Sequence, residues 1–73
     1  MAGDVHTVYK DGNWINEIGG GESFGGTHDT KEQAVEAGRD EARKRQVEHV
    51  IHNQDGTIGE KNSHGNDPRD IPG

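Results

Sequence analysis

The chain has 73 residues, of which 25% are hydrophobic and 30% charged, and its formal net charge is −6. This length allows one small domain with a small core, and the absence of cysteine excludes disulfides and thiolate metal sites. The acidic balance argues against general binding to a phosphate backbone, which depends on clustered lysine and arginine. Nucleic acid is therefore not the expected partner.

The sequence contains no window long and apolar enough for a transmembrane span, and residues 1–12 lack the apolar core of a signal peptide. We therefore expect no membrane association and a cytoplasmic location. Small domains without disulfides commonly gain stability by association. For this reason we expect a homodimer. This expectation would be contradicted if sedimentation at micromolar concentration gave only monomer and that monomer unfolded cooperatively.

The first predicted elements are two strands at residues 5–9 and 14–18, joined by a tight turn. Both segments are rich in β-branched and aromatic residues, and Asp11-Gly12 between them supplies the positive φ that a hairpin turn needs. Alternation in the second strand predicts one face with Trp14, Asn16 and Ile18 and the other with Ile15 and Glu17. We expect Trp14 to contribute most to the core.

The glycine-rich segment that follows, residues 19–26, is predicted to consist mainly of turns. Gly19-Gly20-Gly21 favours a turn, and residues 22–24 are at most a short extra strand before Gly25-Gly26. A phosphate-binding loop is not indicated, because the strand–loop–helix context and the lysine of such loops are missing.

A helix is predicted from Thr30 to about Gln46. Thr30 and Gln33 have the spacing of a capping box, and Arg43, Lys44 and Arg45 place positive charge near the C-terminus, where it is favourable with the helix dipole.

The predicted contact face of this helix is almost without bulk, since it consists of Ala34, Ala37, Gly38 and Ala42. We therefore expect the helix to lie close to a sheet that supplies the large side chains. The candidates are Val8, Trp14, Ile15 or Ile18, and Ile51. A glycine inside a helix costs about 1 kcal/mol relative to alanine, so Gly38 indicates a close approach, and its replacement by leucine should destabilise the protein.

A second hairpin is predicted from residues 47–52 and 57–61, with Asp55-Gly56 in the turn. The polar residues 62–73 contain both prolines and are expected to be a loop or tail. The predicted fold is therefore a single α+β domain over residues 1–73 with its core at about 5–61. Its antiparallel sheet consists of two hairpins (ββαββ, with a short extra strand as an option), and one helix packs on one face.

Five histidines are the main candidates for metal binding: His6, His28, His49, His52 and His64. None has the spacing of a helical metal motif, and His49 and His52 should point to opposite faces of a strand. His6 and His52 converge only if their strands are neighbours. The favoured interpretation is surface or strand-filling histidine, and adventitious zinc or nickel binding by a converged His6 and His52 is the less favoured alternative. We therefore predict neither a dedicated metal site nor a cofactor.

Catalytic signatures are also missing. There is no cysteine nucleophile, neither serine of the chain lies in an elbow motif, and a chain of this size has little mass to enclose a pair of carboxylates. We therefore do not predict an enzyme.

Several short motifs in order along the chain resemble the small bacterial proteins of domain-of-unknown-function family 2188. These motifs are His6-Thr7-Val8, Asp11–Trp14, His28–Ala34, Val50–Ile58 and Ser63–Pro68. The sequence departs from the family pattern at two positions. His64 stands in place of an aromatic residue, and Gly38 in place of the usual alanine.

The resemblance implies a stand-alone α+β module and brings no activity, substrate or cofactor with it. It also implies that Ser63–Pro68 belongs to the domain, where Asn66 and Asp67 brace a turn through side-chain hydrogen bonds or, less favoured, form a recognition motif.

The leading functional hypothesis is a small non-enzymatic interaction module that associates with itself through a sheet edge or the uncovered sheet face. The alternative is a nucleic-acid-binding module that uses the sheet and the basic end of the helix. The residues that we consider for these interactions are Tyr9, Lys10, Trp14, Arg43, Lys44, Arg45, Asn66 and Asp67.

Overall fold

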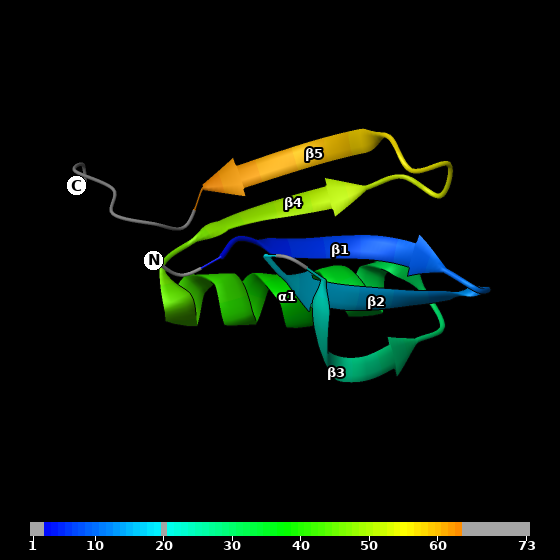
Figure 1. The fold of residues 1–73 in the computed structure, drawn as a ribbon, viewed down its shortest axis with the longest axis horizontal. Helices are drawn as coiled ribbons and strands as arrows, with labels where there is room; N and C mark the ends of the chain where they lie inside the picture. Colours follow the sequence, from blue (N-terminus) through cyan, green and yellow to red (C-terminus); the bar gives the residue numbers. More distant parts are fainter. Residues whose placement is uncertain (1–2, 20, 64–73) are drawn as a thin grey trace.

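The computed structural model describes residues 3–19 and 21–63, which form a five-stranded sheet with one helix on one face (Figure 1). Along the chain the elements are β1 (Val5–Lys10), β2 (Asn13–Ile18), β3 (Glu22–His28), α1 (Lys31–Arg45), β4 (Glu48–His52) and β5 (Ile58–Ser63). Within the sheet the strand order is β3-β2-β1-β4-β5. The protein is thus α+β with a single helix, as predicted.

The prediction of an antiparallel ββαββ sheet is wrong, because the sheet is mixed. β1 and β4 are parallel neighbours at its centre, and the other three neighbouring pairs are antiparallel. The reason is that α1 carries the chain back along the sheet after β3, so that β4 starts at the same end as β1 (Figure 1). Both predicted hairpins are present, and they meet through β1 and β4.

The edge strand β3 has seven residues, so it is much longer than the short extra strand considered from the sequence. Gly25 and Gly26 both have positive φ, 76° and 74°, and lie where the register with β2 shifts between Ile15 and Asn16. They form a bulge in the strand, which resumes at Thr27. Two consecutive glycines in a sequence usually indicate a turn, which is why the length of β3 was missed.

The helix α1 agrees closely with the prediction. Thr30 is the N-cap and its Oγ1 accepts a hydrogen bond from the backbone N–H of Gln33 at 3.2 Å, while Gln46 ends the helix in the left-handed conformation. Glu41 pairs with Arg45 one turn further on, as its spacing predicts. In the described part of the chain, no helix has the length and apolar character needed to cross a membrane.

The helix packs through Ala34, Gly38 and Ala42, which are its buried residues. Trp14 and Ile51 are buried in the sheet, as predicted. However, the large apolar side chains predicted beneath Gly38 are absent among the described residues, and its nearest neighbours in the sheet are Thr7, Asn16 and His49. Val8 and Ile15 cannot reach the helix, because strand alternation places them on the opposite face.

At the C-terminal end, β5 continues to Ser63 and thus includes two residues that were expected in the loop. The turn before it, which contains Gly56 at a φ of 96°, agrees with the predicted Asp-Gly turn. Residues 64–73, with the candidate residues Asn66 and Asp67, lie outside the described residues.

Candidate functional site

A cluster of three polar side chains lies between the sheet and the helix. Thr7 on β1, Asn16 on β2 and His49 on β4 are all 0% exposed. Thr7 Oγ1 donates to Asn16 Oδ1 at 2.6 Å and lies 2.7 Å from His49 Nε2, and Asn16 Nδ2 donates to the carbonyl of Ala34 in α1 at 3.0 Å. Because the hydroxyl has one proton and gives it to Asn16, His49 Nε2 must be the donor in its contact with Thr7.

A hydroxyl beside an imidazole is the pairing that nucleophilic enzymes use. In this protein, however, the helix backbone at Gly38 lies directly over the pair, and all three polar side chains are fully buried. A substrate has no access to them. We therefore interpret the cluster as structural: it fixes the position of α1 over the middle of the sheet, since buried polar groups must find their hydrogen-bond partners.

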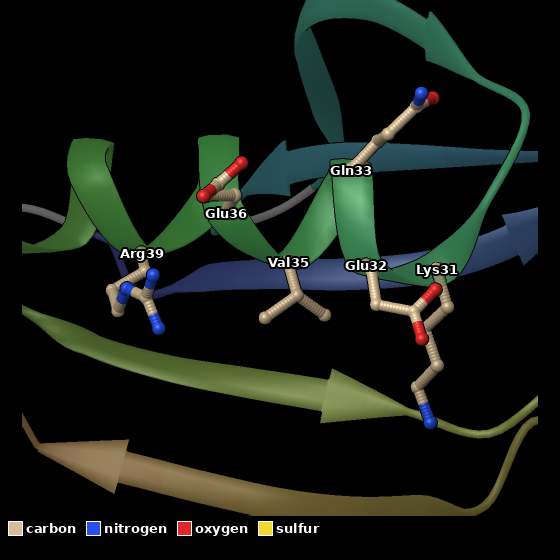
Figure 2. Close-up of a pocket in the computed structure, with 6 residues that line it drawn as sticks. All are labelled: Lys31, Glu32, Gln33, Val35, Glu36 and Arg39. Atoms are coloured by element: carbon tan, nitrogen blue, oxygen red, sulfur yellow. The ribbon is translucent and has the colours of Figure 1, made fainter.

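A second feature is a shallow groove along the flank of α1. It has a volume of about 390 Å³ and is lined by Lys31, Glu32, Gln33, Val35, Glu36 and Arg39. Figure 2 shows Val35 and Arg39 projecting from the helix on the side of β4 and β5. Among the described elements, α1 contacts β1, β2, β3 and β4 but not β5, which leaves this flank open. The groove mixes two acidic and two basic side chains with one valine, so it has no clear preference for a ligand charge.

The third feature is the face of the sheet opposite α1, which we call the open face. It contains Val8, Ile15, Val50 and Ile58 together with His6 and His52. Val8 and Ile15 are cross-strand partners and half-buried, and Val50 lies between its register partners on β1 and β5 and is only 3% exposed. Ile58 is 61% exposed beside its partner His52, and among the described residues it is the large hydrophobic side chain that stands out to solvent.

The open face is bordered by charges of both signs. Lys10 pairs with Glu17 at 3.8 Å over β1 and β2, and Lys61 pairs with Glu48 at 3.9 Å over β4 and β5. Each half of the face thus carries one lysine and one glutamate, and the border as a whole is neutral.

The structure separates the residues that were considered for the alternative of nucleic-acid binding. Tyr9 and Trp14 pack edge to face with ring centroids 5.1 Å apart, and Lys31 Nζ lies 5.6 Å from the centroid of the Trp14 ring. The other end of the helix carries Arg43, Lys44 and Arg45. At a rise of 1.5 Å per residue, this end is about 20 Å from Lys31. Lys44 and Arg45 both lie near Glu41. The two groups therefore do not form one surface.

Reasoning from sequence missed the buried cluster and left the contact between His6 and His52 conditional on their strands being neighbours. The buried cluster had one visible signal, because Asn16 was predicted on the same strand face as Trp14, where a polar residue needs a buried partner. The contact between His6 and His52 depended on the order of the strands, which the sequence did not reveal.

A protein-family model described as an uncharacterised protein conserved in bacteria, domain-of-unknown-function family 2188, matches residues 5–64. No curated protein and no solved structure is significantly similar to the chain.

Proposed function

The chain belongs to the uncharacterised bacterial proteins of domain-of-unknown-function family 2188, and from this starting point we propose that it is a small non-enzymatic interaction module. Its partner is a second copy of the same chain, which docks on the open face. The observation that carries the proposal is the apolar strip of Val8, Ile15, Val50 and Ile58 on the side of the sheet that α1 leaves uncovered.

The first support for this proposal is the size of the existing core. The helix contributes alanine and glycine to it, and the centre of the helix–sheet contact is polar. A domain of this size is of marginal stability unless it gains further burial. A second copy on the open face would cover Ile58 and complete the burial of Val8 and Ile15, at roughly 25 cal/mol per Å² of apolar surface.

The second support is the charge of the border. One lysine and one glutamate on each half allow two identical faces to meet with opposite charges near one another, as a two-fold interface requires. A nucleic acid would meet as many glutamates as lysines on this face. The equal numbers of lysine and glutamate therefore favour a second copy over a polyanion as the partner.

The test is sedimentation equilibrium at micromolar concentrations, in a buffer that contains EDTA, on wild type and on Ile58→Lys. We expect a wild-type dimer, and an association weakened on the order of tenfold or more in the variant, because a lysine would be buried within the apolar contact. Ile58 is largely exposed within one chain, so the substitution should leave the fold intact.

The matched control is Gln33→Lys, which makes the same change of charge at an exposed position on α1. It should associate as tightly as wild type. A wild-type monomer, or an Ile58→Lys variant that still dimerises fully, would refute the proposal. Binding to nucleic acid remains the less favoured alternative, and salt-dependent retention on DNA or RNA is the result that would favour it.

A further inference from the structure

His6 on β1 and His52 on β4 lie side by side on the open face. β1 and β4 are parallel neighbours, and His6 is opposite Val50, two residues before His52. His6 Nδ1 and His52 Nε2 are 3.0 Å apart, and the rings stack with centroids 5.2 Å apart and an interplanar angle of 30°. Both side chains are half-buried, so one side of the pair is accessible to solvent.

We propose that His6 and His52 form a binding site for a divalent transition-metal ion with a tetragonal preference, Cu²⁺ foremost and Ni²⁺ after it. Imidazole nitrogen is a preferred ligand of these ions. The ligating atoms are His6 Nδ1 and His52 Nε2. A single chain supplies both ligands, so the site does not require the proposed self-association. Because the pair lies on the open face, the ion and a second copy would compete for the same surface.

The distance between the two nitrogens is compatible with one shared ion. With metal–nitrogen bonds of about 2.0 Å, two ligand nitrogens are about 2.8 Å apart at a right angle and about 3.3 Å apart at a tetrahedral angle. The observed 3.0 Å lies between the two values. The distance therefore allows either geometry, and Cu²⁺ comes foremost because it binds nitrogen ligands most tightly among the divalent first-row ions.

Without metal, the contact is a hydrogen bond in which one of the two facing nitrogens carries the proton. Binding requires that this proton move to the other nitrogen of the same ring, so that both lone pairs face the ion. Each imidazole stays neutral in this exchange and no proton is lost overall.

The remaining coordination positions belong to water. Within the residues that the structure describes, no group of three or more histidine, cysteine, aspartate or glutamate side chains is placed to hold a metal ion. Glu17, the register partner of His6, is paired with Lys10 instead. The site is thus open on one side, which is the arrangement of an exchangeable surface ion rather than of a closed structural site.

The experiment is calorimetric titration of the full, untagged chain with CuSO₄ and, separately, with NiCl₂. We compare wild type with His6→Gln, with His52→Gln and with the matched control His28→Gln, which removes a histidine from the far edge strand. Removal of either ligand should weaken the binding of Cu²⁺ on the order of tenfold or more, since even the loss of an outer-shell partner has such an effect. The control should bind as wild type does.

A second measurement locates the ion without any substitution. Substoichiometric Cu²⁺ should broaden the imidazole NMR signals of His6 and His52 before those of the other histidines. Broadening centred elsewhere, equal binding by the wild type and the His6→Gln and His52→Gln variants, or no binding would overturn the proposal. The sedimentation experiment contains EDTA, so failure of the metal site and failure of self-association are separate results.

Discussion

At Gly38 the helix approaches the sheet so closely that no side chain fits. A Cβ built there would lie 2.5 Å from Asn16 Oδ1, 2.7 Å from His49 Nε2 and 2.9 Å from Thr7 Oγ1. Those three atoms are the ends of side chains that hold one another by hydrogen bonds, so they cannot turn aside without breaking buried contacts. Gly38 and the polar cluster therefore depend on one another.

Replacement of Gly38 by alanine should destabilise the protein by about 1–3 kcal/mol through overpacking. On an open helix surface the same change would stabilise by about 1 kcal/mol, so the sign of the effect tests the packing. The measurement is urea unfolding at one chain concentration, with Asp40→Ala at an exposed helix position as the control. Gly38→Leu should destabilise the protein more than Gly38→Ala. An alanine variant as stable as wild type would rule this packing out.

Asp55 organises the turn between β4 and β5. Its Oδ1 accepts hydrogen bonds from the backbone N–H of Thr57 at 3.0 Å and from Thr57 Oγ1 at 2.8 Å. These bonds favour the charged carboxylate and lower the pKa of Asp55 below its ordinary value of 3.8. Since the folded pKa is the lower one, the contribution of Asp55 to stability is complete above pH 3.8 and is lost as the pH falls through the folded pKa.

NMR titration of the Asp55 carboxyl carbon should give a folded pKa below 3.8. In Thr57→Val the hydroxyl bond is missing and the backbone bond remains, so the pKa should move part of the way back toward the ordinary value. An identical pKa in both proteins would show that the hydroxyl has no part in the shift.

At the scale of elements, α1 is held at its ends by local contacts and in its middle by the sheet. The Thr30 cap and the left-handed residue Gln46 involve only neighbours in sequence. Ala34, Gly38 and Ala42, by contrast, are buried because α1 packs against β1, β2, β3 and β4. The limits of the helix are thus local properties, and its packing is not.

Replacement of Thr30 by alanine should cost about 1 kcal/mol, because the N–H of Gln33 loses its acceptor. Thr30→Ser keeps the hydroxyl and should retain most of the stability. Urea unfolding of both variants measures the difference. If the alanine and serine variants unfold at the same urea concentration, the cap contributes nothing measurable.

At the scale of the whole molecule, one helix covers one face of a five-stranded sheet and does not reach β5. The apolar residues of the open face and the exposed Ile58 follow from this arrangement. If a second copy covers them, folding and association are linked, and the stability of each chain depends on its concentration.

We therefore expect the melting temperature of the wild type to rise with chain concentration and that of Ile58→Lys to rise much less. Differential scanning calorimetry over a wide concentration range measures both. Gln33→Lys should behave as wild type does. A wild-type melting temperature that does not change with concentration would contradict a linked dimer.

The residues that carry local signals determined much of the fold by themselves. Asp11-Gly12 and Asp55-Gly56 indicated the two hairpins, Thr30 with Gln33 indicated the start of the helix, and Gly38 indicated a close approach. Each of these depends on backbone conformation or hydrogen bonds within a few residues. Such preferences do not require any knowledge of distant parts of the chain.

Only the tertiary structure decided the parallel pairing of β1 with β4, the polar cluster beneath Gly38 and the contact between His6 and His52. These residues are far apart in sequence, and His6 and His52 are separated by 46 positions. Their meeting depends on the order of the strands, which is set by the free energy of packing the whole chain. That free energy has no local signature, because the same strand patterns are compatible with several sheet orders.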